Sequence, residues 1–220
     1  MKRLGLLLLP ILAITLMLGG NAFAQNVGDN SVYFVTYYSN ANTSGAPDGT
    51  LRIINDGDQA TAAPEGVENG PLWADIYVFD DSQEMQTCCS CYVSADGLLS
   101  ESVNKELVNN SINFTGRAEI QRGVIKVVSS IYPDPTAVVP EPGLRGWMTH
   151  IQATATTFAG TAGIAKNAVE KGPWFVTETA LADSNLTALE LGNLEALCSY
   201  GLTIGSGYGY CYCTPEDYDF

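Results

Sequence analysis

The sequence predicts a mainly β protein: a single β-sandwich-like domain with a C-terminal helix and disulfide cross-links. Three observations support this prediction. Runs dense in β-branched and aromatic residues recur along the chain and are separated by turn-forming residues. A helical pattern appears strongly only near the C-terminus. Six cysteines form three local groups, with an even total.

The predicted strands are short and follow one another along most of the chain. The run at 72–79 is almost continuously apolar, which favours a central strand that is buried on both faces. The turn at 46–49 combines a proline that presets φ with a glycine that tolerates positive φ. The predicted strands are 31–38, 50–54, 72–79, 123–131, 147–158 and 174–177.

Two helices are predicted, and the second carries the stronger signal. The weak one spans 162–171 and stops before a Gly-Pro pair. The strong one spans 186–200, with Asp183 or Ser184 as N-cap and Gly201 as its end. Its expected buried stripe is Leu186, Leu189, Leu194 and Leu197. Four prolines within 133–142 predict a stiff surface loop.

The first 24 residues have the pattern of a secretory signal peptide. A basic start at 1–3 precedes an apolar run of 15 residues at 4–18, and a small-residue cleavage site follows at 22–24. That run is shorter than the roughly 20 residues a membrane helix needs. We therefore expect a secreted domain at 25–220, located in the periplasm, at the cell surface or outside the cell, with no membrane span after cleavage.

The charge balance argues against several partners. Loss of Lys2 and Arg3 with the signal leaves 8 basic residues against 24 acidic ones, a net charge of −16. Nucleic acids and anionic membranes would repel such a chain, because binding a polyanion normally needs a basic face. We expect no nucleic-acid partner, and we interpret the acidity mainly as a source of solubility.

The cysteines favour disulfides over metal binding or redox exchange. They are Cys88, Cys89, Cys91, Cys198, Cys211 and Cys213. An even count in an exported chain is typical of a disulfide framework, although six cysteines allow fifteen pairings. We expect bridges between the CCxC group, interpreted as a loop, and the C-terminal segment. A zinc or iron–sulfur knuckle is less favoured, because CCxC and CxC differ from the usual CxxC spacing.

No set of residues predicts catalysis or a cofactor. His150 is the only histidine, and no GxSxG elbow accompanies it, so a secreted hydrolase ranks third among the functions considered. The best Ca²⁺ candidates are Asp56, Asp58, Asp80 and Asp81, but the EF-hand ladder is absent. Incidental loop carboxylates are the favoured interpretation.

Several runs resemble a family of secreted bacterial proteins of the Acidobacteria type. The runs are YYSNAN (37–42), APDGTLRIIND (46–56), IYVFDDSQEMQTCCSC (76–91), GLLSESVN (97–104), RGVIKVVSS (122–130) and CTPEDYDF (213–220). The resemblance covers most of the mature chain. It implies export and a shared fold, and it carries no activity or catalytic residue.

Two functions follow from these patterns. The first is a self-assembling extracellular or surface subunit, whose N-terminal strand pairs with the sheet edge of a neighbour. The residues of this assembly strand are Val32, Phe34, Val35 and Tyr37. The alternative is a monomeric secreted module that binds a carbohydrate or another envelope component by aromatic stacking. The stacking candidates are Trp73, Trp147, Trp174 and Tyr210.

Overall fold

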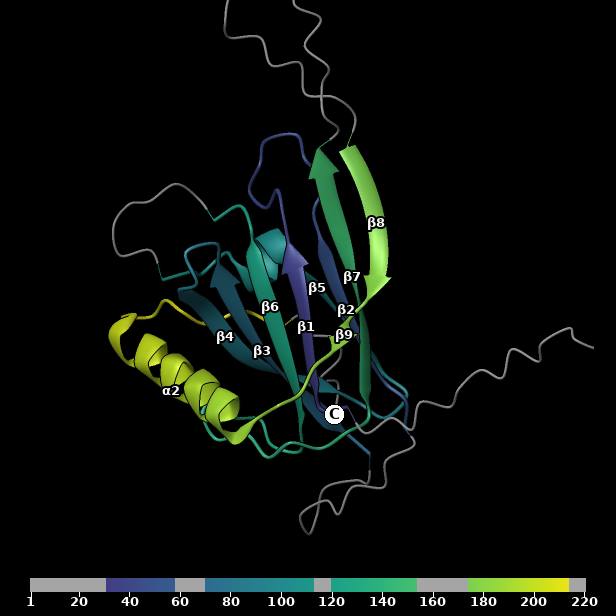
Figure 1. The fold of residues 1–220 in the computed structure, drawn as a ribbon, viewed down its shortest axis with the longest axis vertical. Coiled ribbons are helices and arrows are strands. Elements are labelled where there is room, and N and C mark those ends of the chain that lie inside the picture. The colour runs from purple at the N-terminus through teal and green to yellow at the C-terminus, as the bar shows by residue number, and fades with distance from the viewer. Residues whose placement is uncertain (1–30, 58–69, 113–119, 154–173, 214–220) are drawn as a thin grey trace, which may run out of the picture.

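A computed structural model describes residues 31–57, 70–112, 120–153 and 174–213. Two antiparallel sheets face each other, and one long helix lies against the outside of one of them (Figure 1). This architecture confirms the predicted β-rich, sandwich-like fold with a C-terminal helix. No helix in these four ranges is long and apolar enough to cross a membrane.

The first sheet has five strands in the order β4-β3-β6-β1-β9. The continuously apolar strand β3 lies between β4 and β6, as predicted for a strand buried on both faces. The N-terminal strand β1 pairs with β6 along its whole length. The bounds are β1 Tyr33–Tyr38, β3 Leu72–Asp80, β4 Met85–Val93, β6 Gly123–Ser130 and β9 Ala182–Asp183.

The second sheet has four strands in the order β5-β2-β7-β8. A short π-helical turn, η1 (Val103–Leu107), follows β5 directly. The strand β8 pairs with β7 on one side, and no described strand pairs with its other edge. The bounds are β2 Thr50–Asn55, β5 Leu98–Ser102, β7 Leu144–Ala153 and β8 Trp174–Ala180.

The main core fills the space between the two sheets. Alternate residues of β2, such as Leu51 and Ile53, face Ile76 and Ile125 of the other sheet, and all four are almost fully buried. The chain crosses between the sheets directly after β8, and Leu181 packs over Gly146 at this crossing. A Cβ added at Gly146 would lie 2.6 Å from Leu181 Cδ1, so glycine permits the close approach.

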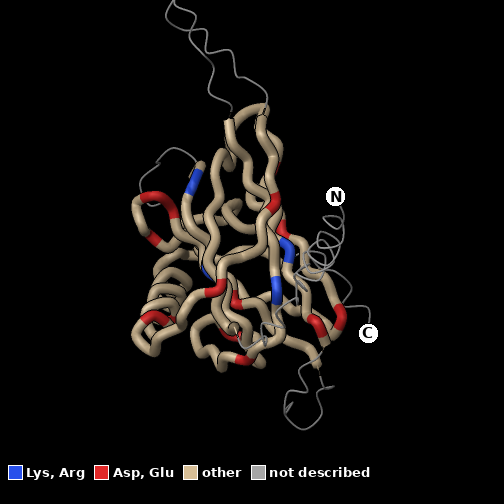
Figure 2. Tube along the Cα trace, turned by 45° about the vertical axis from the view of Figure 1, so that its right-hand side comes forward, with Lys and Arg blue, Asp and Glu red and all other residues tan. Residues whose placement is uncertain are grey.

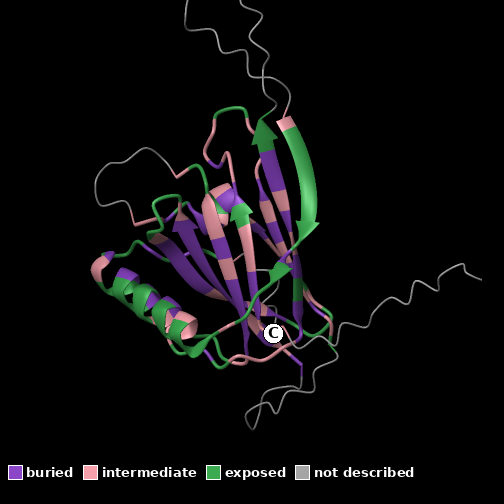
Figure 3. Cartoon of the chain, in the orientation of Figure 1, coloured by how far each residue is buried: buried purple, intermediate pink, exposed green. Residues whose placement is uncertain are grey.

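A second core lies beneath the helix α2 (Ala188–Ile204), on the outer face of the five-stranded sheet. Leu194 and Cys198 of the helix pack against Tyr77 and Phe79 of β3. Thr187 caps the helix by accepting a hydrogen bond from the Glu190 backbone N–H. Figure 3 shows the result: β3 and β4 are buried beside the helix, whereas β8 at the other end of the molecule is exposed.

Several strand predictions were incomplete. The CCxC group, expected in a loop, lies within β4, which is buried on both faces. The short strand β5 and the turn η1 were not predicted. The strand predicted at 147–158 begins earlier, at Leu144, and is described to Ala153. The strand predicted at 174–177 continues to Ala180.

The position of the C-terminal helix was predicted correctly, but the side of the helix that is buried was not. Leu194 is buried as expected, whereas Leu189 and Leu197 are exposed. The buried stripe is Leu194, Cys198 and Gly201, because the disulfide of Cys198 turns that side of the helix towards β4. The cap is Thr187 rather than Asp183 or Ser184, and the helix passes Gly201 to end before Gly205. The predicted signal peptide 1–24 and helix 162–171 lie outside the described residues.

Candidate functional site

Three disulfides connect β4 to α2 and to the segment that follows the helix. Cys88 bonds Cys198, Cys89 bonds Cys211, and Cys91 bonds Cys213. The Cα–Cα distances are 5.8, 5.2 and 5.4 Å, all within the ordinary range for disulfides. The expected connection between the CCxC group and the C-terminal segment is therefore confirmed.

The alternation of side chains along β4 explains this pairing. Cys88 points towards the helix, whereas Cys89 and Cys91 belong to the core between the sheets. The segment after α2 runs parallel to β4: the Cys88 N–H donates to Gly209 O over 3.0 Å, and the Cys211 N–H donates to Cys88 O over 3.2 Å. One side of this segment therefore meets Cys89 and Cys91.

The other side of the same segment carries exposed tyrosines. The predicted stacking residue Tyr210 packs edge to face with Tyr212, with ring centroids 5.1 Å apart. Trp73, on β3, makes a similar edge-to-face contact with Tyr92 of β4. Trp174 begins β8 on the second sheet. The four predicted stacking residues therefore do not form one platform.

The outer face of the four-stranded sheet carries clustered polar and aromatic groups. No described element covers this face (Figures 1 and 3). Trp147 of β7 lies there, partly exposed, directly opposite Arg52 of β2. Leu98 of β5 and Val176 of β8 add exposed apolar area to this sheet. We call Arg52, Trp147, Thr149 and Glu178 the open-face cluster.

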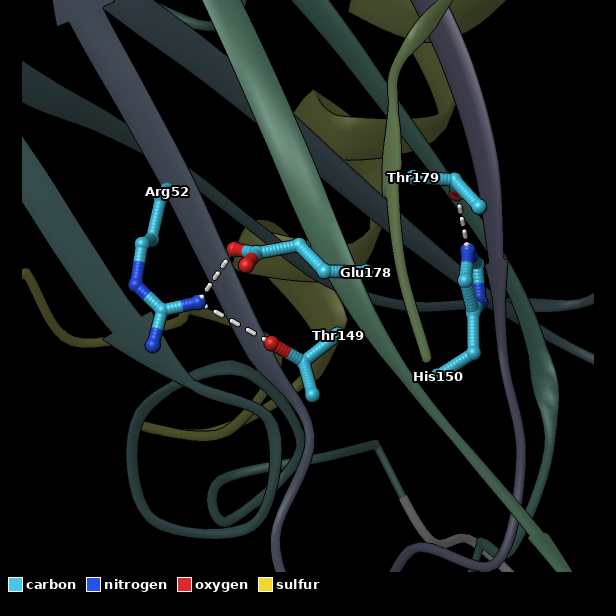
Figure 4. Close-up of polar contacts among 5 residues, drawn as sticks. All are labelled: Arg52, Thr149, His150, Glu178 and Thr179. Carbon is cyan, nitrogen blue, oxygen red and sulfur yellow. Dashed lines mark hydrogen bonds and ion pairs between the residues drawn. The ribbon is translucent and has the colours of Figure 1, made fainter. Parts of the chain in front are cut away.

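Polar contacts in the open-face cluster hold Arg52 in a fixed orientation (Figure 4). Its Nη1 donates to Glu178 Oε1 over 2.7 Å and to Thr149 Oγ1 over 3.0 Å. The strand register produces this arrangement, because Trp147 pairs with Arg52 across β2 and β7, and Thr149 pairs with Glu178 across β7 and β8. An indole therefore lies next to a preorganised guanidinium, carboxylate and hydroxyl.

His150 lies on the same strand, and its ring is enclosed in the protein interior. Only 2% of the residue is exposed, and its ring stacks on Tyr37 with centroids 4.1 Å apart. Nε2 lies 2.7 Å from Thr179 Oγ1, and Nδ1 has no side-chain partner in the described part of the chain (Figure 4). Burial lowers the pKa of His150, because it disfavours the charged form of the ring. A triad would need a carboxylate at Nδ1.

Asp75 is a second buried ionisable group that the sequence analysis missed. It lies on β3 with no exposed surface, near the hydroxyls of Ser90 and Ser130. Neither carboxyl oxygen makes a hydrogen bond of ordinary geometry to a described residue. Burial raises the pKa of Asp75 to about 7, against a smaller opposing effect of the two serines. The negative charges of Asp134 and Glu195 also raise the pKa of Asp75, by a smaller amount.

The Ca²⁺ candidates are engaged in turns and ion pairs. Asp80 accepts hydrogen bonds from the backbone N–H groups of the turn after β3 and from the Gln86 amide. Asp81 pairs with Arg122, and Asp56 pairs with Arg145. Asp58 lies outside the described residues. Figure 2 shows the described acidic residues scattered over several loops and strands, and no carboxylate cluster of metal-binding geometry occurs among them.

The predicted assembly strand is β1, together with Val32 just before it. Phe34 is buried, Val35 is partly buried and Tyr37 is 45% exposed. All six residues of β1 pair with β6 within the same chain, and β9 pairs only with Phe34 and Val35 on the other side.

Comparison with protein-family models, with curated proteins and with solved structures finds no match to this chain. The function must therefore be argued from the residues themselves.

Proposed function

We propose that the protein is an exported carbohydrate-binding module that uses the open-face cluster to bind a neutral glycan. The observation that carries the proposal is the position of Trp147, partly exposed on an uncovered sheet beside the fixed Arg52–Glu178 pair. This is the ligand-binding alternative of the sequence analysis, narrowed to one of its four aromatic candidates.

The chemistry of the cluster suits a sugar ring. An indole offers a flat apolar face on which the C–H face of a pyranose stacks. The guanidinium, carboxylate and hydroxyl groups around it supply donors and acceptors for ring hydroxyls, and their mutual contacts reduce the entropy lost on binding. The strongly acidic composition favours a neutral glycan over an acidic one.

Export is part of the same proposal. The signal-like pattern at 1–24 supports secretion. The three disulfides support folding in an oxidising compartment, where a secreted glycan-binding protein would meet its ligand.

The test is a binding titration of the oxidised mature chain with soluble neutral oligosaccharides built of glucose, mannose, xylose or N-acetylglucosamine. We expect Trp147→Ala to weaken binding at least about tenfold, which corresponds to roughly 1.4 kcal/mol. Trp73→Ala is the matched control, because Trp73 lies on the other sheet. Equal losses in both variants, or no binding to any of these sugars, would contradict the proposal.

Self-assembly through the N-terminal strand is a second candidate. One observation favours it: β9 covers the second edge of β1 only at Phe34 and Val35, so no described strand pairs there with 36–38. A neighbouring copy would add its strand at this edge. Light scattering of the oxidised mature chain should then give a molar mass that grows with concentration. A monomer at all concentrations would rule this candidate out.

A further inference from the structure

Two of the three disulfides lie in direct contact with each other. Cys89–Cys211 and Cys91–Cys213 both join β4 to the segment after α2, and Cys89 Sγ lies 3.7 Å from Cys91 Sγ. The sulfur atoms of Cys89, Cys91 and Cys213 all fall within 4.8 Å of one another. Cys211 lies outside this group of three, but its bond to Cys89 makes it the nearest source of a fourth sulfur.

This grouping is a direct result of strand geometry. Residues two apart on a strand share a face, so Cys89 and Cys91 point the same way, as do Cys211 and Cys213. The backbone hydrogen bonds between Cys88 and both Gly209 and Cys211 align the two segments in parallel. Each of the two neighbouring segments therefore supplies two sulfurs, and the bonds Cys89–Cys211 and Cys91–Cys213 join the segments pairwise.

The CCxC and CxC spacings differ from the CxxC spacing of a metal-binding knuckle. This difference does not count against a metal site that is shared between two chain segments. A knuckle formed by one loop needs its thiolates further apart in sequence, whereas here each CxC pair supplies only one edge of the site. With Zn–S bonds of about 2.3 Å, neighbouring sulfurs of a zinc tetrathiolate lie about 3.8 Å apart. The distance between Cys89 Sγ and Cys91 Sγ, 3.7 Å, matches such an edge without any movement of β4.

We propose that, when its disulfides are reduced, the protein binds one Zn²⁺ through the thiolates of Cys89, Cys91, Cys211 and Cys213. A phosphine reductant converts each disulfide and one water into two thiols and a phosphine oxide. Zn²⁺ then displaces one proton from each of the four thiols and forms four Zn–S bonds. The metal and the two disulfides are thus alternative links between the same two segments.

The surroundings define the kind of site. Cys89, Cys91 and Cys211 are buried, and Cys91 has no exposed surface. Four protein ligands leave no position open for substrate, as in structural zinc sites. Cys213 is only partly buried, so it is the side from which an ion enters. The site would hold the segment after α2 on β4 before the disulfides form.

The experiment titrates Zn²⁺ into the mature chain, reduced by a phosphine under anaerobic conditions, and counts bound zinc by native mass spectrometry. We expect one Zn²⁺ per reduced chain and none per oxidised chain. Replacing Zn²⁺ with Co²⁺ should give the intense thiolate-to-metal charge-transfer absorption of a tetrathiolate.

Two variants separate the four-sulfur site from general thiol binding. Cys91→Ser should weaken zinc binding at least about a hundredfold, because it removes one of four ligands. The double variant Cys88→Ser, Cys198→Ser is the matched control and should bind like the wild type, since it removes only the bridge on the helix side. If reduction unfolds the chain, circular dichroism should report refolding on addition of zinc. Equal affinities of the two variants, or a reduced wild type that binds no zinc, would overturn the proposal.

Discussion

The two sheets of this protein differ in what covers their outer faces. Helix α2 covers the five-stranded sheet, so that both faces of β3 are buried. The four-stranded sheet has a buried inner face and an outer face that no described element covers. Polar groups follow this difference: Asp75 is enclosed and its pKa is raised, whereas Arg52 and Glu178 pair at the surface. Buried groups therefore lie on both faces of the covered sheet, whereas the open sheet keeps paired charges at its surface, where the proposed glycan site lies.

The largest expected effect concerns the enclosed carboxyl of Asp75. Its pKa rises from 3.8 to about 7 on folding. Between these pH values the unfolded chain has released the proton while the folded chain retains it. The free energy of unfolding should therefore fall as the pH rises through this window, by up to about 4 kcal/mol, and stay low above pH 7.

Asp75→Asn should remove this dependence. The free energy of unfolding of the variant should therefore rise relative to that of the wild type as the pH rises. Urea unfolding at a series of pH values measures the difference. His150 acts in the opposite direction, because its lowered pKa makes the folded state lose stability as the pH falls below 6.5. Its contribution cancels when both proteins are compared at the same pH. Parallel pH profiles would show that Asp75 is not the titrating group.

A smaller effect tests the packing difference between the sheets directly. Leu194 on α2 is 1% exposed, and Val176 on β8 is 54% exposed. We expect Leu194→Ala to cost about 3 kcal/mol, because it leaves a cavity above β3. Val176→Ala should stay within about 0.5 kcal/mol of the wild type. Chemical denaturation of both variants gives the comparison, and similar losses would mean that the two sheets are equally well covered.

The sequence predicted the elements whose patterns are local. The alternation of 50–54 and the apolar run of 72–79 identify β2 and β3 without reference to the rest of the chain. The strand β4 was missed because most of its buried positions are filled by three cysteines and a glutamine, which carry little strand signal. The face of α2 was misjudged for a related reason, since a cysteine and a glycine occupy it where leucines were expected.

The candidate site was predictable only in part. Trp147 stood out as an aromatic residue in a strand-like run. Its polar neighbours did not, because Arg52 lies 97 residues from Thr149 and 126 residues from Glu178 in the sequence. Asp75 could not be recognised either. It is a single acidic residue within an apolar strand, and the sequence around it does not indicate which groups will surround it. Only the pairing of strands brings such groups together.

The bridge between Cys91 and Cys213 also determines how the oxidised protein would respond to a mechanical load. A pull between residue 31 and residue 213 would be transmitted along 31–89 and then shared between that bond and the parallel bridge Cys89–Cys211. Strands β1, β2, β3 and part of β4 would bear the tension. The segment from β5 to α2 lies inside the closed covalent ring and would remain unstretched, so that a stretched molecule would lengthen only within residues 31–91.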